Sequence, residues 1–399
     1  MNQDLQKLQP YPFERLRDLL ADAQPPADKP LVDLGIGEPR HPTPRFIAES
    51  LSTSLNDGLS RYPATRGKDP LCRAIAAWLE TRFRLDAGQI DADSQVLPVA
   101  GTREGLFSVA QALVDRQAVP LVMMPNPFYQ IYEGAALLAG AEPRFLHCDR
   151  SNGYLPDPDA LPPEDWDRCQ LLYLCSPGNP SGAVIGKSLM QRFLDLADRH
   201  DFILVADECY SELYPNEDTP PPGLLQICAE TGRTDFRRCL VFHSLSKRSN
   251  APGLRSGFVA GDAAILREFL RYRTYHGCAL PEHVQQASAA AWADEAHVRE
   301  NRRLYREKFD AVLAILGDCL EVSRPEAGFY LWPRTPVDDQ DFARRLYQEE
   351  HVRVLPGSYL SRDTALGNPG RNHVRMALVA DQAHCEAAAH RIRALVRRL

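Results

Sequence analysis

The sequence predicts an α/β protein with a large domain, in which a mostly parallel sheet is flanked by helices, and a smaller α+β domain. The first observation is that strand-length apolar runs alternate with helical patterns such as residues 71–83 and 104–114. The apolar runs are residues 95–100, 120–124, 171–175, 202–206 and 240–243. Such alternation is typical of helices that cover a parallel sheet. The second observation is the length of 399 residues, which exceeds what one hydrophobic core usually serves.

The C-terminal part of the chain has a different pattern. Residues 295–316 form a long helical pattern with few breakers, which could bridge two domains. Strand-like runs follow at residues 328–332, 352–356 and 372–379, before a last helix from Gln382. We therefore expect residues 46–285 to form the large domain and residues 286–399 the small domain. Residues 1–45 are expected to be an N-terminal arm that docks on the protein and adds part of the small domain.

Composition and charge exclude several classes of protein. The chain is 44% hydrophobic and 25% charged, with a formal net charge of −7, so it offers no long-range attraction for nucleic acid or anionic lipid. It has neither an apolar run of membrane-spanning length nor the pattern of a signal peptide. The ten cysteines include no C-x-x-C pair, so neither disulfides nor a zinc site is expected. We expect a cytoplasmic protein without a metal.

One lysine stands among groups suited to phosphate. The segment Ser244-Leu245-Ser246-Lys247 follows the apolar run 240–243, and Arg255 comes eight residues after the lysine. In an apolar, cation-rich pocket an ammonium loses hydration and its pKa falls, so the free amine can attack a carbonyl carbon. Lys247 is therefore a candidate nucleophile, with Ser244, Ser246 and Arg255 as candidate phosphate ligands.

Two turns after strand-like runs could also hold a ligand. Gly101, Thr102 and Arg103 open the helix that follows the first apolar run, where free backbone N–H groups and the helix dipole favour an anion. The turn-rich segment Ser176 to Gly182 forms a rigid loop that could present the amide of Asn179. Ligands of open α/β sheets bind at such strand ends.

Three further side chains lie at or within strand-like runs. Asp207 ends the run 202–206, where it either caps a helix or pairs with a cationic group on a ligand. Tyr129 follows the run 120–124 and either packs in the core or stacks on a flat ligand. Arg375 lies in an apolar strand, where a buried guanidinium needs a carboxylate or a phosphate.

Taken together and in this order, these segments resemble the fold-type I, class I/II aminotransferases, which use pyridoxal 5′-phosphate. The resemblance runs from about Leu31 to the C-terminus. Its most specific parts are the segments Ser176 to Gly182, Asp207 to Tyr210 and Ser244 to Gly257, with Arg375 after them. It implies a fold-type I structure with the cofactor at the strand ends of the large domain.

The resemblance implies a role for each matching residue. Lys247 would form a Schiff base with the cofactor aldehyde and move a proton during catalysis. Asp207 would pair with the ring nitrogen so that the ring can accept electrons. The ring would also be contacted by Asn179, Tyr210 and Tyr129, and its phosphate would be held by Gly101, Thr102, Arg103, Ser244, Ser246 and Arg255.

The resemblance also implies a substrate site and a second subunit. Arg375 would bind the substrate α-carboxylate, with Gly37 and Asn179 beside it. Tyr62 matches a tyrosine that reaches the phosphate from a neighbouring subunit. The implied assembly is therefore a homodimer with shared active sites.

Several longer passages look like the N-succinyldiaminopimelate aminotransferases of lysine biosynthesis; these passages are residues 11–17, 37–42, 246–262 and 272–278. The likeness implies transfer of an amino group from glutamate to N-succinyl-2-amino-6-oxopimelate, with release of 2-oxoglutarate. That substrate carries carboxylates far from the reacting carbon. We therefore expect a cationic pocket, for which Arg40, Lys68 and Arg273 are candidates.

Three alternatives stay open. Another class I aminotransferase, or a pyridoxal-phosphate-dependent β-lyase, would share the cofactor residues. The segment Ser244 to Lys247 also spells the S-x-x-K motif of serine acylases, but the Ser-Asp-Asn and Lys-Thr-Gly motifs that accompany it are absent from the sequence. The acylase alternative also leaves Asp207, Asn179 and Arg375 without a role.

Overall fold

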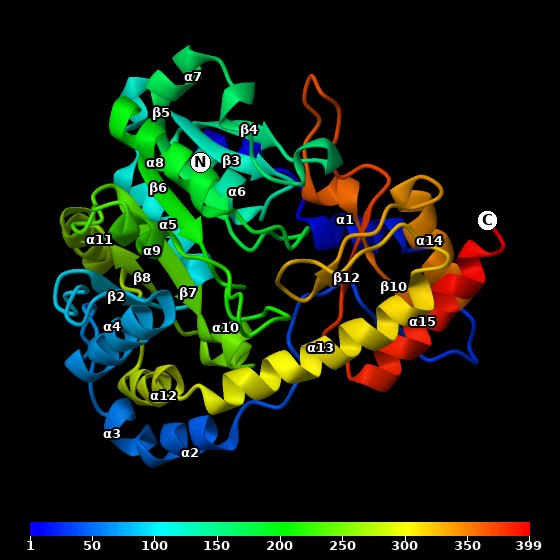
Figure 1. The fold of residues 1–399 in the computed structure, drawn as a ribbon, viewed down its shortest axis with the longest axis horizontal. Helices are drawn as coiled ribbons and strands as arrows, with labels where there is room; N and C mark the ends of the chain where they lie inside the picture. Colours follow the sequence, from blue (N-terminus) through cyan, green and yellow to red (C-terminus); the bar gives the residue numbers. More distant parts are fainter.

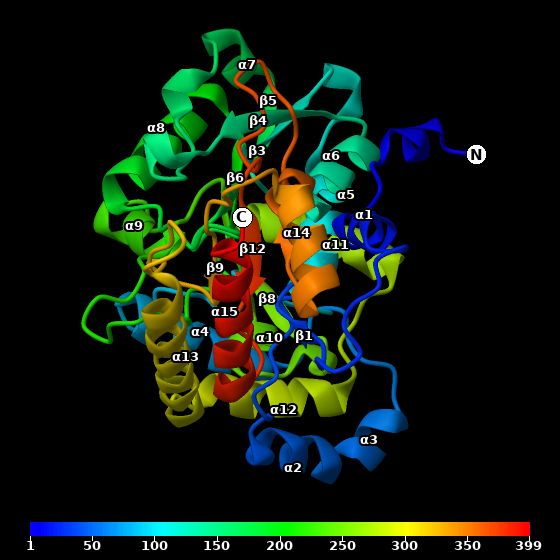
Figure 2. The same ribbon diagram turned by 90° about the vertical axis from the view of Figure 1, so that its right-hand side faces the viewer.

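The structure, a computed structural model, describes residues 1–399 and has two domains (Figure 1). In the large domain, helices lie on both faces of a seven-stranded sheet. The small domain lies beside it and carries the C-terminal helix (Figure 2). The predicted α/β class, with a large domain and a smaller α+β domain, is confirmed.

The large sheet is mostly parallel. Its strands are β2 (Val96–Val99), β3 (Leu121–Asn126), β4 (Glu142–His147), β5 (Cys169–Cys175), β6 (Ile203–Asp207), β7 (Cys239–Ser244) and β8 (Gly257–Gly261). They are arranged in the order β2-β8-β7-β6-β5-β3-β4, and only β8 runs antiparallel to its neighbours. The carboxyl ends of the other six strands therefore meet at one edge of the sheet.

Five of these strands match the predicted apolar runs, and two were not expected. The edge strand β4 is only partly buried and contains Glu142, Pro143 and Arg144, so it lacks an apolar pattern. Strand β8 has a glycine at each end, which lowers its β-propensity. Both strands form because their neighbours offer backbone partners.

Alternate side chains of each strand enter two different cores, one on each face of the sheet. In β5, for example, Leu172 and Leu174 belong to one core, whereas Leu171 and Tyr173 belong to the other. The first core is completed by α4 (Asp69–Phe83), α8 (Lys187–His200), α9 (Leu224–Glu230) and α12 (Glu282–Ala293). The second core is completed by α5 (Thr102–Leu113), α6 (Ile131–Ala139) and α11 (Ala263–His276).

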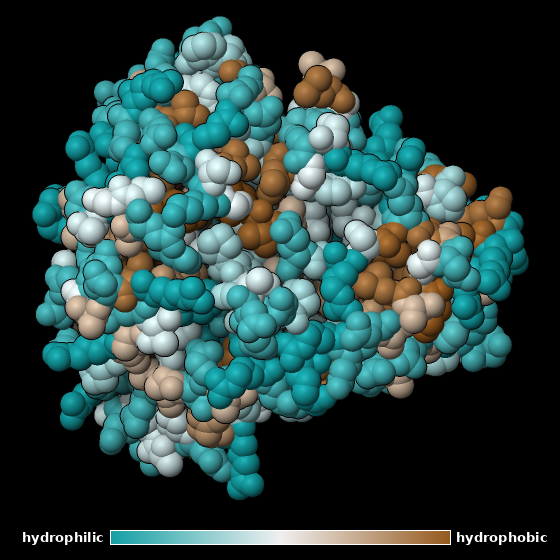
Figure 3. Space-filling view, viewed as in Figure 1, coloured by the Kyte–Doolittle hydropathy of each residue, from teal (hydrophilic) through white to brown (hydrophobic).

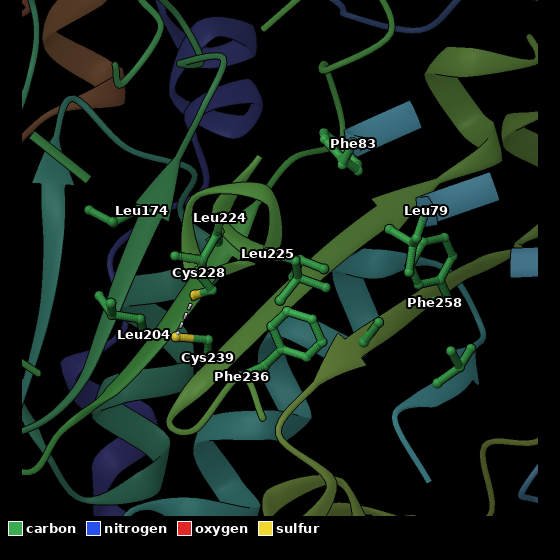
Figure 4. Close-up of a cluster of buried hydrophobic side chains, with 14 of the residues drawn as sticks. Leu79, Phe83, Leu174, Leu204, Leu224, Leu225, Cys228, Phe236, Cys239 and Phe258 are labelled. Carbon is green, nitrogen blue, oxygen red and sulfur yellow. Dashed lines mark hydrogen bonds between the residues drawn. The ribbon is translucent and has the colours of Figure 1, made fainter. Parts of the chain in front are cut away.

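Part of the first core is shown in Figure 4. Leu174 and Leu204, from neighbouring strands, are both fully buried together with Leu224 of α9. The thiols of Cys228 and Cys239 are 3.6 Å apart in this core, and all ten cysteines of the chain are free. Close packing on both faces holds the strand ends in place.

Short helices complete the large domain. They are α2 (Arg45–Thr53), α3 (Leu55–Leu59), α7 (Pro163–Arg168) and α10 (Leu245–Arg248). Helices α2 and α3 pack on α12, whereas α7 packs on α8. The one-turn helix α10 follows β7 directly and carries Lys247.

The small domain is built on a three-stranded antiparallel sheet in the order β11-β12-β9. Its strands and helices are β9 (Tyr330–Leu331), β10 (Val352–Arg353), β11 (Leu355–Pro356), β12 (Val374–Ala377), α13 (Ala296–Leu316), α14 (Asp339–Glu350) and α15 (Gln382–Val396). The predicted single strand at 352–356 is wrong. It is divided into β10, which pairs with the N-terminal strand β1 (Val32–Asp33), and β11, which pairs with β12. Helix α14 was not predicted.

Helix α13 joins the two domains (Figure 1). Near its start, Arg302 forms ion pairs with Glu212 and Glu217 of the large domain. Near its end, Val312 and Leu316 pack in the core of the small domain. The bridging role predicted for residues 295–316 is therefore seen in the structure.

The N-terminal arm packs on both domains. Leu16, on α1 (Pro12–Leu19), packs against Leu355 and Leu360 of the small domain. The 3-10 helix Gln3–Lys7 contacts α6 of the large domain. The arm thus docks as expected, whereas the boundaries at residues 45/46 and 285/286 stay predictions.

The surface is largely hydrophilic. On the face shown in Figure 3, apolar side chains gather at the domain boundary and over the small domain. None of the helices combines the length and the apolar character that a membrane span requires.

Candidate active site

A cavity of about 680 Å³ lies at the carboxyl ends of the large-sheet strands, where the two domains and the N-terminal arm meet. Most of the predicted site residues line it. These are Gly37, Thr102, Arg103, Tyr129, Asn179, Asp207, Tyr210, Ser244, Ser246, Lys247, Arg255 and Arg375. The parallel strands bring Asn179, Asp207 and Lys247 to one edge of the large sheet, and the N-terminal part and the small domain add Gly37 and Arg375.

Lys247 points into this cavity from α10. Its Nζ donates a hydrogen bond to the backbone oxygen of Gly37 at 2.5 Å and lies 5.3 Å from the ring centre of Phe329. Burial lowers the pKa of Lys247 to about 8, and Arg375 and Arg103 act in the same direction. About a tenth of this amine is therefore uncharged at pH 7, far more than in an ordinary lysine.

Asp207 lies on the floor of the cavity and is 4% exposed. One carboxylate oxygen accepts a hydrogen bond from the Tyr132 hydroxyl at 2.6 Å, and the other accepts from the backbone N–H of Cys209 at 3.2 Å. Asp207 makes no ion pair with the protein. A buried carboxylate with neutral partners can bind a cationic group of a ligand.

The start of α5 and the residues around Arg255 form an anion cradle. Gly101 caps α5 with a φ of +83°. A Cβ at this position would lie 2.2 Å from the Arg255 guanidinium, so the glycine allows the arginine to lie against the backbone. Arg255 has no acidic partner, and the Ser244 hydroxyl accepts from the Ser246 N–H at 3.1 Å. These groups suit a phosphate.

Arg375 and Asn179 meet on the opposite wall. The Arg375 guanidinium donates to Asn179 Oδ1 at 3.0 Å and to the Gly35 oxygen at 2.9 Å. Its Nε is buried and has no partner, and no carboxylate pairs with it. The unfilled donor of a buried guanidinium fits a ligand carboxylate.

Aromatic side chains enclose the space between these walls. The Tyr129 hydroxyl accepts a hydrogen bond from Arg103 Nε at 2.7 Å. The hydroxyls of Tyr210 and Tyr330 are 2.9 Å apart, and burial raises the pKa of Tyr210 well above its usual value. Tyr210 is therefore a neutral hydrogen-bonding group.

Some predicted residues lie away from the cavity. The side chain of Tyr62 is fully exposed and does not reach the cavity of its own chain. Among the candidates for distal carboxylates, Lys68 forms an ion pair with Glu282, and Arg273 is fully buried against Glu104. Neither they nor Arg40 line the cavity, so the prediction that these three form its cationic pocket is wrong for a single chain.

The sequence did not reveal a buried polar group behind Lys247. Asn301, on α13, donates to the Lys247 backbone oxygen at 3.2 Å. Its own side-chain oxygen contacts His41 at 2.8 Å and Asn250 at 3.0 Å. Asn301 thus links the bridging helix to the segment that carries the lysine, and it lies in a helical pattern that gives no local sign of this contact.

Tyr132 and Tyr330 were also missed. Nothing in their local sequence marks these two hydroxyls, and only the folded chain shows that the Tyr132 hydroxyl reaches Asp207 and the Tyr330 hydroxyl reaches Tyr210.

Comparison with known proteins agrees with this geometry. Residues 29–392 match the family model of the aminotransferases of class I and II. This chain belongs to the class I and II aminotransferases. The curated relatives of this aminotransferase include an LL-diaminopimelate aminotransferase of Nitratidesulfovibrio vulgaris (strain DP4), with 31% identity over 91% of this chain and 90% of the relative.

Two solved structures are similar over almost the whole length. An aminotransferase from Neisseria meningitidis has a TM-score of 0.95 and 48% identity, with full coverage of both chains. A probable N-succinyldiaminopimelate aminotransferase from Thermus thermophilus has a TM-score of 0.84 and 28% identity, over 96% of this chain and 99% of that one. The predicted family is therefore confirmed.

The cofactor of this family is pyridoxal 5′-phosphate, and the cavity fits it. Three groups support the fit: the amine of Lys247 has a lowered pKa, the buried carboxylate of Asp207 has no cationic partner, and Arg255 lies beside the start of α5. Arg375 lines the cavity without an acidic partner, which suits one more anionic group, such as the carboxylate of an amino acid.

Proposed function

We propose that this aminotransferase transfers an amino group from glutamate to N-succinyl-2-amino-6-oxopimelate, in the biosynthesis of diaminopimelate and lysine. The observation that carries amino transfer is the presence of Lys247, Asp207 and Arg375 in one cavity. The substrate is supported by the passages that resemble N-succinyldiaminopimelate aminotransferases and by the similar Thermus structure.

A second candidate substrate is free LL-diaminopimelate. It is favoured by the Nitratidesulfovibrio relative, whose name specifies that substrate. N-succinyl-LL-diaminopimelate, the amino form of the first substrate, and LL-diaminopimelate both present an α-amino acid to the reacting centre and differ at the far end. The same residues around Lys247 would serve either one.

The residues that would bind the cofactor each act through a specific group. Pyridoxal 5′-phosphate supplies an aldehyde carbon that accepts the substrate amine and a ring that accepts electrons. We propose that Asp207 keeps a proton on the ring nitrogen, while Asn179 and Tyr210 bind the ring oxygen and Tyr129 stacks on the ring. The phosphate would be held by Gly101, Thr102, Arg103, Ser244, Ser246 and Arg255, together with Tyr62 of a second copy.

Lys247 would act twice in the proposed reaction. Its uncharged amine would hold the cofactor through the aldehyde carbon, and when free it would move a proton to or from the substrate Cα. Arg375 binds the substrate α-carboxylate beside Gly37 and Asn179. This contact orients the Cα–H bond toward Lys247, which is a gain from positioning.

The proposed assembly is a cytoplasmic homodimer with shared active sites. Its support is the side chain of Tyr62, which is fully exposed and is accompanied by Leu59, 70% exposed. A tyrosine and a leucine on an exposed surface suit an interface between protein chains.

A single-turnover experiment would test the substrate. The cofactor-loaded protein is mixed with glutamate, with N-succinyl-LL-diaminopimelate or with LL-diaminopimelate, and the cofactor absorbance is followed. We expect glutamate and the succinyl compound to react, with LL-diaminopimelate slower by about tenfold or more. Faster reaction of LL-diaminopimelate would favour the second candidate. Release of pyruvate and ammonia from a β-substituted amino acid, without amino transfer, would instead indicate a β-lyase.

A further inference from the structure

A second large cavity lies between the two domains, apart from the candidate active site. It has a volume of about 990 Å³ and shares no lining residue with the active-site cavity. One wall is residues 147–154 and Ser181 of the large domain. The other wall comes from residues 321–334 and 366–373, in the segments around β9 and before β12 (Figure 2). We call this cavity the interdomain groove.

Two arginines of the groove have no acidic partner. Arg150 pairs with Glu321, and Arg324 pairs with Asp310. Arg334 and Arg371, by contrast, are exposed and make neither an ion pair nor a side-chain hydrogen bond, although both line the groove. Two free guanidinium groups on one wall favour an anion there, since the three carboxylates of the lining, Asp149, Glu321 and Glu326, have partners of their own.

A buried donor points to the same kind of ligand. Trp332 is 8% exposed, and its Nε1 is buried without a hydrogen-bond partner. The indole stacks on the His373 ring, with ring centres 5.2 Å apart and an angle of 10°. An N–H group without an acceptor costs free energy, whereas an oxygen of a bound ligand would satisfy it.

The interdomain groove adjoins the substrate site but is distinct from it. Between them lies a gap that Trp332, Ser181 and Asn179 line, and its volume is about 20 Å³. That space can hold about one water molecule and is too small for a substrate chain. A substrate held by Arg375 therefore cannot extend into the groove.

The two cavities nevertheless share three chain segments. Ser181, Trp332 and His373 line the groove. The active site is lined by Asn179, Tyr330 and Arg375, and each of them lies two residues along the chain from one of these three. A ligand in the groove would thus contact the same segments that hold the substrate.

We propose that the interdomain groove is a second anion-binding site, which takes a small multivalent anion between Arg334, Arg371 and the Trp332 N–H. The ligand class is inorganic phosphate or a small polycarboxylate, since both present several negative oxygens to guanidinium groups. The site is independent of which amino acid the enzyme uses.

Calorimetric titration of the cofactor-loaded protein tests this site. Inorganic phosphate and citrate are added separately at constant ionic strength, so that general screening stays the same. We expect saturable binding of at least one of them. The double variant Arg334→Gln, Arg371→Gln should weaken it about tenfold or more, because each change removes a charged hydrogen-bond donor. Trp332→Phe, which keeps an aromatic ring and removes the N–H, should weaken it by a smaller factor.

Two controls make the result decisive. Arg299→Gln removes an exposed arginine that lies outside the groove and has no acidic partner, and it should leave binding unchanged. Arg375→Ala removes the proposed carboxylate site, and it should also leave binding in place. The proposal is overturned if neither anion binds, if the double variant binds as well as the unchanged protein, or if Arg375→Ala abolishes binding.

Discussion

At the scale of single residues, the chemistry depends on how Lys247 is surrounded. Its amine is buried in a cavity with Arg375 and Arg103, and it donates to the oxygen of Gly37. Loss of hydration and nearby positive charge both disfavour the ammonium, so the pKa falls to about 8, while Glu38 acts in the opposite direction. The amine becomes uncharged as the pH rises through this value.

The reactivity of Lys247 should therefore level off at lower pH than that of an ordinary lysine. In the cofactor-free protein, its acylation rate should rise about tenfold between pH 7 and pH 9 and then change little, because the free amine is then nearly complete. The acylation rate of a lysine in a short peptide should rise about a hundredfold over the same pH range. Trace acetylation followed by mass spectrometry gives both curves. A Lys247 curve that follows the peptide would contradict the lowered pKa.

At the scale of elements, a buried ion-pair network holds α13 against the large domain. Glu212, which is 3% exposed, pairs with Arg82 of α4 and with Arg302 of α13. The arginines lower the pKa of Glu212 although burial alone would raise it. Since α13 also carries Asn301, this network helps to set the position of Lys247.

Removal of the Glu212 charge should destabilise the protein strongly. In Glu212→Gln, the buried Arg82 loses its only carboxylate partner and Arg302 keeps only Glu217, so we expect the free energy of unfolding to fall by about 3–5 kcal/mol. Glu217→Gln is the matched control, because Glu217 pairs with Arg302 and Arg306 from a half-exposed position and should cost about 1 kcal/mol at most. Denaturant unfolding of both variants measures the difference. Equal effects would show that burial of Glu212 does not matter.

At the scale of the whole molecule, one chain does not bring all of the predicted site residues together. Tyr62 is fully exposed, whereas the other predicted phosphate ligands lie in or beside the cavity. A symmetric dimer would bury such an exposed surface and could place each Tyr62 at the cavity of the other chain.

Mixed dimers would test the shared site. Lys247→Ala should abolish amino transfer. Tyr62→Ala should weaken cofactor binding enough to impair amino transfer. In a hybrid of the two variants, one site has an intact Lys247 and an intact Tyr62. Random mixing should restore about a quarter of the unchanged activity at limiting cofactor, because half of the dimers are hybrids with one good site each. If activity does not return although hybrids form, Tyr62 does not act across the interface.

Much of the fold and of the site can be predicted from local patterns. The runs that became β3, β5, β6 and β7 are apolar because both faces of a parallel sheet are covered, and turn residues follow each run. Asn179, Asp207 and Lys247 could be located because they stand directly after such runs. The strands β4 and β8 could not be found in this way, since β4 carries polar residues and β8 is a short apolar run between two glycines, and backbone pairing with neighbours fixes both.

The sequence by itself determined the family, five of the seven large-domain strands and the residues at their ends. Only the tertiary structure decided which distant groups meet: Asn301 behind Lys247, the Tyr132 hydroxyl on Asp207, and the ion pairs that remove Lys68 and Arg273 from the cavity. The reason is physical. A strand or a turn is specified by neighbouring residues, whereas the partner of a buried polar group is chosen by packing between segments that are far apart in the chain.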